Sequence, residues 1–214
     1  LKVNHQSIYY SDLTNKSLHI INKKKNTKTF IVQFNSKKIK IINNIKDSLW
    51  VHFMYLDNNE FIDQFKNIVL NKRKDQFFSA DLSRRSISKL NLKKYLAKID
   101  LLICSTKELP SLFKTNKCKE FNKFSIEKLK TLSKTITYIV VHNKRKSLCF
   151  IDGKIIEVDN RNIVNNKNFH ITGAGDTYTA ALINEFIINK LIDNKSISTA
   201  HRIASKFCAG NIKI

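Results

Sequence analysis

The sequence predicts an α/β protein in which a mainly parallel β-sheet is covered by helices on both faces. Short segments rich in β-branched and aromatic residues alternate along the chain with longer segments whose apolar residues recur every three or four positions. With 42% hydrophobic residues among 214, the chain can also bury a core of ordinary size. Alternating strands and helices favour parallel strands, because each helix returns the chain to the edge from which the previous strand started.

The individual elements follow from this patterning. In the first predicted helix, Phe61, Phe65 and Val69 recur every fourth residue and give one apolar face. The strands before residue 45 follow one another without helices, so we expect residues 1–45 to be antiparallel and peripheral, and residues 46–214 to be the α/β core of a single domain. The predicted strands are residues 28–34, 38–42, 49–56, 76–81, 100–104, 137–141, 147–151 and 154–158, and the predicted helices are residues 58–71, 89–98, 125–135, 176–191 and 196–210.

The charge of the chain does not favour a nucleic-acid partner. It carries 39 Lys and Arg residues against 17 Asp and Glu residues, a net charge of +22. These basic residues are scattered in many short groups, and no aromatic and basic module or zinc knuckle accompanies them. The general abundance of Asn, Ile and Lys is more typical of A+T-rich coding than of a binding patch.

Composition also bears on the cellular compartment. No apolar run approaches the roughly 18 to 20 residues that cross a bilayer, and the first residues lack the pattern of a signal peptide. The four cysteines form no C-x-x-C pair, and three of them lie in apolar runs that indicate buried thiols in a reducing compartment. We therefore expect a cytoplasmic protein without a membrane partner.

One short segment carries the clearest chemical signal. Two of the four glycines, Gly173 and Gly175, flank Ala174 and are followed directly by Asp176 and a helical pattern. A glycine loop that leads into a helix directs unpaired backbone N–H groups and the positive end of the helix dipole at one point, which predicts an anion site. Glycine permits both unusual backbone angles and the close approach of a phosphate. A plain turn with Asp176 as N-cap fits the same letters.

Residues 169–183, FHITGAGDTYTAALI, resemble the C-terminal signature of the ribokinase-like (PfkB) carbohydrate kinase family, in which D-T-x-G-A-G-D precedes small residues on a helix. Residues 98–109 resemble the family's strand and N-x-x-E element, with Ser105 at the Asn position and Glu108 at the acidic one. The resemblance spans roughly residues 45 to 214. The chain therefore looks like the C-terminal two-thirds of such a kinase, without its N-terminal strands and part of its β-stranded lid.

Two further segments follow in the family's order. Residues 137–158 resemble the strand, T-x-G-x-x-G turn and hairpin that bind the nucleotide. Residues 198–207 resemble the closing helix, with His201 where Asn or His often lies beside the adenine. The resemblance thus implies an ATP-dependent kinase that acts on a hydroxyl group of a sugar or nucleoside, and it leaves a homodimer open.

The resemblance also implies a role for each residue of the glycine segment. Asp176 would be the general base that takes the proton from the acceptor hydroxyl group. The backbone N–H groups of Gly173, Ala174 and Gly175 would form the anion hole for the transferred phosphoryl group. Thr172 would contribute contacts to phosphate or to a monovalent cation.

A magnesium site is implied beside them. Glu108, with Ser105, would hold Mg²⁺ largely through water, because this ion keeps much of its hydration shell. Ser105 in place of Asn weakens that shell. His170 and Ile171 replace the Asp and Thr that usually open the signature, which puts the monovalent-cation site in doubt.

The nucleotide turn departs furthest from the family. His142, Lys144 and Ser147 stand at the T-x-G-x-x-G positions, so the turn has lost its threonine and both glycines. Residues 144–146 are basic and fit a solvated hairpin tip better than a phosphate contact. The alternative function is therefore a non-catalytic binding or regulatory protein on the same fold, whereas the intact GAGD favours the kinase.

Overall fold

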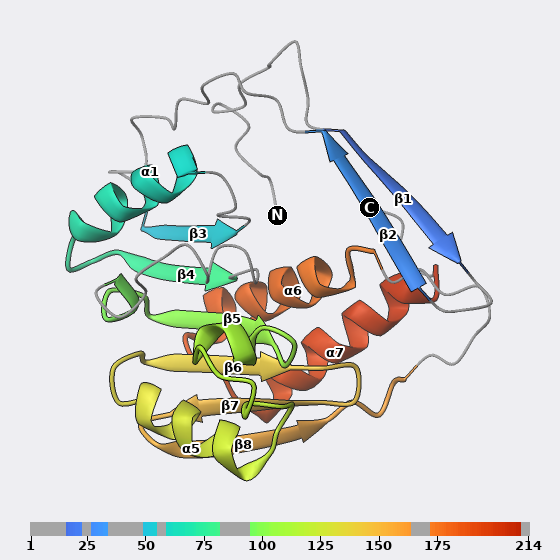
Figure 1. Cartoon of the computed structure of the whole chain (residues 1–214). Coiled ribbons are helices and arrows are strands. Elements are labelled where there is room, and N and C mark those ends of the chain that lie inside the picture. The colour runs from blue at the N-terminus through green and yellow to red at the C-terminus, as the bar shows by residue number, and fades with distance from the viewer. Residues whose placement is uncertain are drawn as a thin grey trace. The chain divides into compact units, whose positions relative to one another are not determined.

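The structure is a computed structural model that describes residues 16–22, 27–33, 49–54, 59–81, 95–163 and 172–210 (Figure 1). The chain divides into two compact units, Leu1–Lys46 and Asp47–Ile214. In the first unit, strands β1 (Lys16–Asn22) and β2 (Thr27–Gln33) pair antiparallel. The predicted strand at residues 28–34 and its antiparallel pairing are confirmed, whereas β1 was not predicted and residues 38–42 lie outside the described residues.

A six-stranded sheet forms the centre of the second unit, in the order β3-β4-β5-β6-β7-β8. Strands β3 to β6 are parallel, and β7 and β8 are added antiparallel. The prediction of a mainly parallel sheet is therefore confirmed. The strands are β3 (Trp50–Met54), β4 (Phe77–Asp81), β5 (Leu101–Ser105), β6 (Tyr138–His142), β7 (Lys146–Ile151) and β8 (Lys154–Asp159).

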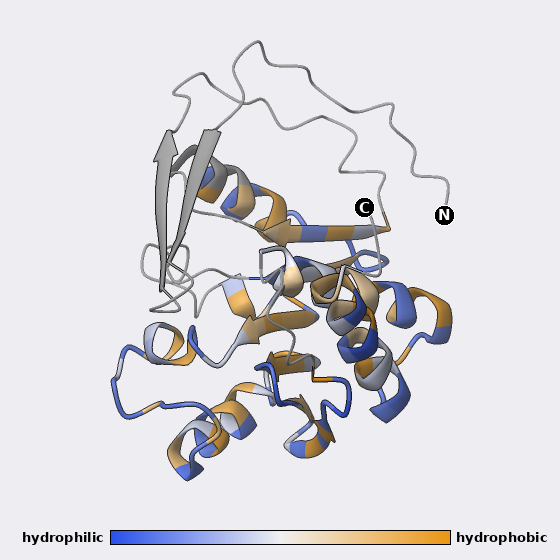
Figure 2. Ribbon diagram, turned by 90° about the vertical axis from the view of Figure 1, so that its right-hand side faces the viewer, coloured by the Kyte–Doolittle hydropathy of each residue, from blue (hydrophilic) through white to orange (hydrophobic). Residues whose placement is uncertain are grey.

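Helices cover both faces of this sheet, as predicted (Figure 1). Along β5, Leu102 and Cys104 belong to the core shared with α1, α4 and α5, whereas Leu101 and Ile103 belong to the core shared with α6 and α7. Figure 2 shows the resulting hydrophobic colouring of the central strands. The helices are α1 (Asn59–Leu70), α4 (Leu109–Leu112), α5 (Lys123–Leu132), α6 (Ala174–Asn189) and α7 (Asn194–Cys208).

The remaining differences from the predicted elements are small. Of the predicted helix at residues 89–98, only residues 95–98 are described, and they form a single turn. The four-residue helix α4 was not predicted. Among the described residues, none of the helices combines the length and the apolar character that crossing a membrane requires.

An aromatic cluster holds α6 on the sheet. The Phe186 ring lies 4.6 Å from that of Phe77, 5.2 Å from that of Trp50 and 5.4 Å from that of Tyr138, measured between centroids. Edge-to-face and tilted aromatic pairs of this kind add to the free energy gained by burial. The C-terminal half of α6 is therefore fixed against three strands.

We expect Phe186→Ala to lower the free energy of unfolding by about 3 to 4 kcal/mol, because it removes a buried ring and leaves a cavity. Urea denaturation measures this loss. Ile188→Ala, two residues along the same helix at a position that is 66% exposed, is the matched control and should change stability by less than about 0.5 kcal/mol. Equal effects of the two substitutions would contradict this packing.

Candidate functional site

The carboxyl ends of the parallel strands bring several polar residues to one edge of the sheet. Asp81 ends β4, Ser105 ends β5 and His142 ends β6. Ser105 and His142 are direct register partners. In open α/β sheets this edge is where ligands bind, since the loops and helix starts that follow the strands gather there.

Helix α6 begins with a left-handed glycine. Gly173 is the N-cap, with φ at 85°, and no side chain caps the helix. The first helical hydrogen bond runs from the Thr177 N–H to the Gly173 carbonyl at 2.8 Å, so the N–H groups of Ala174 and Gly175 have no acceptor within the helix. These groups and the helix dipole give the positive end that the sequence predicts, although α6 begins at Ala174, two residues earlier than expected.

The backbone angles and the surroundings of Gly173 and Gly175 differ, so the two positions would tolerate a larger residue to different degrees. A Cβ atom on Gly173 would lie 3.2 Å and 3.3 Å from two ring carbons of Phe207, in addition to the strain of its positive φ. Gly175 lacks a positive φ, and a Cβ atom on it would meet nothing within 4 Å. Of the two properties for which glycine is suited, Gly173 uses the unusual backbone angle, whereas Gly175 leaves open space beside the helix start.

Near this helix start, Asp81 lies within electrostatic reach of two other carboxylates, Glu108 and Asp176. The half-buried Asp81 accepts a hydrogen bond from the Thr179 hydroxyl at 2.8 Å. Its pKa is raised to about 6, chiefly by burial and further by the negative charges of Glu108 and Asp176, while the Thr179 hydrogen bond lowers it. Asp176 itself is exposed in the first turn of α6. Asp81 was not predicted as a site residue, although an acid that ends a strand at this edge was the available signal.

The two residues expected at a magnesium ion are bonded to each other. The backbone N–H of Ser105 donates to Glu108 Oε2 at 2.7 Å, and the Ser105 hydroxyl donates to the same oxygen. Ser105 therefore fixes the Glu108 carboxylate rather than offering a separate ligand. Among the described residues, no three His, Cys, Asp or Glu side chains gather to hold a metal directly. A carboxylate oxygen is a ligand type that Mg²⁺ accepts, and the magnesium contact of Glu108 stays a prediction.

Thr172, Gly173, Ala174 and Gly175 are brought together at the start of α6, with Thr172 and Gly175 exposed. His170 and Ile171, on which the doubt about a monovalent cation rests, lie outside the described residues. The monovalent-cation contact stays a prediction.

His201 lies in a buried polar cluster instead of on an open surface. Only 4% of the residue is exposed, and its Nε2 is 2.9 Å from the Ser147 hydroxyl oxygen, which in turn is 2.7 Å from the Tyr178 hydroxyl oxygen. The half-buried His142 ring stacks on Tyr178 at 4.4 Å. An adenine contact of His201 stays a prediction that this burial does not favour.

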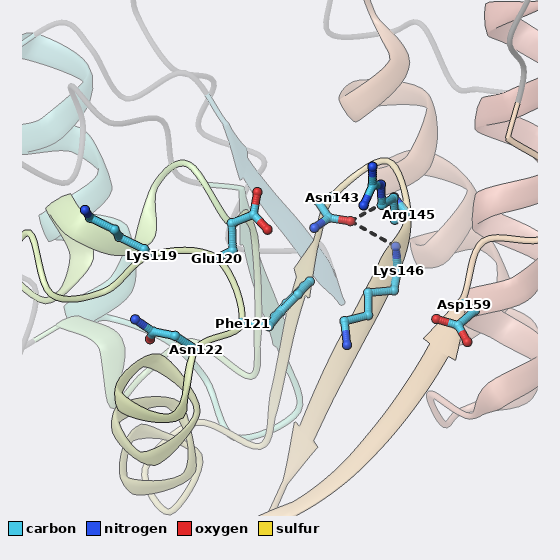
Figure 3. A pocket seen from close by; sticks show the side chains of 8 residues that line it. All are labelled: Lys119, Glu120, Phe121, Asn122, Asn143, Arg145, Lys146 and Asp159. Atoms are coloured by element: carbon cyan, nitrogen blue, oxygen red, sulfur yellow. Dashed lines mark hydrogen bonds between the residues drawn. The ribbon is translucent and has the colours of Figure 1, made fainter.

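Side chains of the expected nucleotide turn are likewise bonded within the protein. Strand β6 runs through His142 and β7 begins at Lys146, so Ser147 lies inside a strand and is fully buried. The turn is tied by Asn143, whose Oδ1 accepts from the backbone N–H groups of Arg145 at 2.8 Å and Lys146 at 2.9 Å (Figure 3). Two of the T-x-G-x-x-G positions thus face the protein interior or a neighbouring ring.

A surface pocket of about 480 Å³ lies beside this turn (Figure 3). Lys146 forms an ion pair with Glu157, and its Nζ lies 5.3 Å from the centre of the Phe121 ring. The basic lining is therefore balanced by acids and gives no clear anion site. The pocket is lined by Lys119, Glu120, Phe121, Asn122, Asn143, Arg145, Lys146 and Asp159.

The two glycines should respond differently to alanine. We expect Gly173→Ala to lower the free energy of unfolding by about 1 to 3 kcal/mol, since it strains a left-handed residue and displaces Phe207. Gly175→Ala should leave stability unchanged or raise it by up to about 1 kcal/mol, because alanine favours a helix and has room here. Urea denaturation of both variants tests this, and similar losses would show that the two positions are not distinct.

Acid should destabilise the protein. The pKa values of His52, His142 and His201 are each lowered from 6.5 to about 4 by burial, with the charge of His201 adding to the shift of His142. At pH values between about 4 and 6.5, the histidines of the unfolded chain bind more protons than those of the folded protein. The free energy of unfolding therefore falls as the pH falls from about 6.5 towards 4. The raised pKa of Asp81, about 6, acts in the opposite direction over its own range, where stability is lost as the pH rises.

Unfolding measured by urea at pH values from 4.5 to 8 should therefore show the greatest stability above about pH 7. Asp81→Asn removes the opposing carboxyl group and should make the loss below pH 6 steeper. A stability that is flat or rises on acidification would contradict the burial of these histidines.

Comparisons with known proteins identify the fold. No protein-family model matches the chain, and no curated protein matches it in sequence. Among solved structures, a pyrophosphate-dependent kinase in the ribokinase family, complexed with a pyrophosphate analogue and myo-inositol, matches with a TM-score of 0.64 and 20% identity. That match covers 92% of this chain and 70% of the other.

Two further solved structures give the same result. A fructokinase from Vibrio cholerae with bound fructose, ADP and calcium matches with a TM-score of 0.66 and 16% identity, over 95% of this chain and 69% of the other. An adenosine kinase from Schistosoma mansoni matches with a TM-score of 0.67 and 11% identity, over 92% of this chain and 62% of the other. The chain therefore has the ribokinase-like fold, which sugar and nucleoside kinases share.

Proposed function

We propose that the protein is a phosphotransferase that moves the terminal phosphoryl group of a donor to a hydroxyl group of a sugar or nucleoside. The observation that carries this proposal is the start of α6, where Gly173 caps a helix whose first N–H groups and exposed Asp176 lie in one turn. Asp81 is near enough to Asp176 and to Glu108 for the charge of each to act on it. A positive helix end beside carboxylates suits a reaction that brings an anionic donor to an alcohol.

In the proposed mechanism Asp176 is the general base. The acceptor hydroxyl group gives its proton to the Asp176 carboxylate while its oxygen attacks the terminal phosphorus of the donor. The bond from that phosphorus to the bridging oxygen breaks, and the shortened donor leaves with the bonding electrons. The backbone N–H groups of Gly173, Ala174 and Gly175 stabilise the charge on the transferred phosphoryl group.

Glu108 is proposed to hold Mg²⁺ through water, with Ser105 fixing the direction of the carboxylate. When bound, the ion would neutralise charge on the donor phosphates. Asp81, whose carboxylate interacts electrostatically with those of Glu108 and Asp176, is proposed to share in holding the ion.

We propose ATP as the donor, in line with the resemblance in the glycine segment. A second donor, pyrophosphate, is favoured by the burial of His201 and Ser147, since the positions expected to meet the nucleotide are bonded to each other inside the protein. One structural neighbour is described as pyrophosphate-dependent. Pyrophosphate has no nucleobase, so such a donor needs only the phosphate contacts at the start of α6.

The test is phosphoryl transfer by the full chain from ATP and, separately, from pyrophosphate to a panel of sugars and nucleosides. Asp176→Asn keeps the size of the side chain and removes the base, so we expect kcat to fall by about 10²- to 10⁴-fold. Asp152→Asn is the matched control: it lies in the β7–β8 turn, where its φ of 46° suits asparagine equally well, and it should retain full activity.

The outcomes separate the candidates. Transfer that depends on Asp176 supports the kinase, and the donor that works decides between ATP and pyrophosphate. Folded wild-type protein that transfers from neither donor would favour the non-catalytic alternative. Asp176→Asn with unchanged kcat would refute the assignment of the base.

A further inference from the structure

Four side chains from four elements form a polar cluster beneath the first turn of α6. Tyr178 of α6 is hydrogen-bonded to Ser147 of β7, and Ser147 is hydrogen-bonded to His201 of α7. The His142 ring at the end of β6 stacks on Tyr178 with 24° between the ring planes, and the Tyr178 and His201 rings meet edge to face at 5.1 Å. One hydroxyl group thus links α6, the β6–β7 hairpin and α7.

Burial makes these hydrogen bonds costly to lose. Ser147 is fully buried, Tyr178 is 2% exposed and His201 is 4% exposed. A buried hydroxyl group without a partner costs about 1 to 3 kcal/mol. The three groups can be satisfied in one direction along the chain of bonds: the Tyr178 hydroxyl donates to Ser147, and the Ser147 hydroxyl donates to the neutral imidazole of His201.

The cluster adjoins both halves of the proposed site without entering it. Tyr178 follows Asp176 by two residues, within the first turns of α6. His142 is the register partner of Ser105, which holds Glu108, and the His142 carbonyl accepts from the Thr106 N–H at 2.9 Å. A shift of Tyr178 would therefore move the start of α6 relative to the end of β5, where Ser105 holds Glu108.

The start of α6 also lacks the usual means of fixing its own position. Gly173 has no side chain that could cap the helix. Two successive residues make up for this: Tyr178 is bonded to Ser147 on the hairpin, and Thr179 is bonded to Asp81 at the end of β4. The first turns of the helix are thereby held from two strands.

We propose that Tyr178, bridged by Ser147 to His201, is a positioning residue that sets the direction in which the start of α6 and Asp176 face the reacting groups. This inference rests on the proposed phosphotransferase function. All three side chains are buried, so in this proposal each acts through the helix start.

The first test compares Tyr178→Phe with the same change at Tyr138. Tyr138 begins β6, at the end of the strand opposite His142, and its ring contacts Phe186. Tyr178→Phe keeps the ring and its stacking on His142 and removes only the hydroxyl group. We expect kcat to fall about 10- to 100-fold with the acceptor KM within about twofold, because a misplaced base weakens the transition state more than binding. Tyr138→Phe should leave both constants unchanged.

A double-substitution cycle tests the bridge itself. Ser147→Ala should reduce kcat by the same factor as Tyr178→Phe, and the double variant should be no slower than either single variant, since all three interrupt one chain of bonds. Multiplying effects would overturn the inference that the two hydroxyl groups act as one unit.

Hydrogen–deuterium exchange provides a readout that needs no activity. In Tyr178→Phe, the backbone amides in the first turns of α6 should exchange up to about tenfold faster than in the wild type, while those of β5 and β6 stay unchanged. Unchanged exchange at the start of α6, or faster exchange with unchanged kcat, would overturn the positioning role. If the wild type transfers no phosphoryl group, the proposed function fails, and exchange still decides whether Tyr178 fixes the helix start.

Discussion

The close contact of Gly173 with Phe207 is the constraint on which the candidate site depends. A Cβ atom at position 173 would lie 3.2 Å from the Phe207 ring of α7, so any larger residue would have to displace that ring, and the left-handed backbone of Gly173 favours glycine for a second, independent reason. The chain can therefore turn sharply into α6 directly against α7. The aromatic packing of Phe186 fixes the other half of the same helix.

Electrostatics then limits what such a site can hold. Burial and, to a lesser extent, repulsion by the charges of Glu108 and Asp176 raise the pKa of Asp81. An anionic phosphoryl donor would add to this repulsion unless positive charge offsets it. The helix end supplies a fixed partial charge, a bound Mg²⁺ ion would supply a larger one, and the net charge of +22 draws anions towards the molecule from a distance.

The sequence predicted those features that depend on local patterning. Buried strands such as residues 100–104 and 137–141 were placed to within one residue, because continuous apolar β-branched runs between polar turns have few alternatives. The start of α6 was placed two residues late, since Ala174 and Gly175 look like loop residues until the hydrogen bond to Gly173 is known. The pairing of Ser105 with Glu108 spans three residues and was within reach of sequence reasoning.

Contacts between residues far apart in the chain could not be predicted from the sequence. Whether His201 faces a ligand or the interior depends on Ser147, 54 positions earlier, and on Tyr178 between them, so no local pattern could decide it. The same contacts explain what serine does at position 147 of the β6–β7 hairpin. Glycine at position 147 could not bond to either partner, whereas serine joins two helices to a strand. Ser147 in this hairpin thus strengthens the frame of α6.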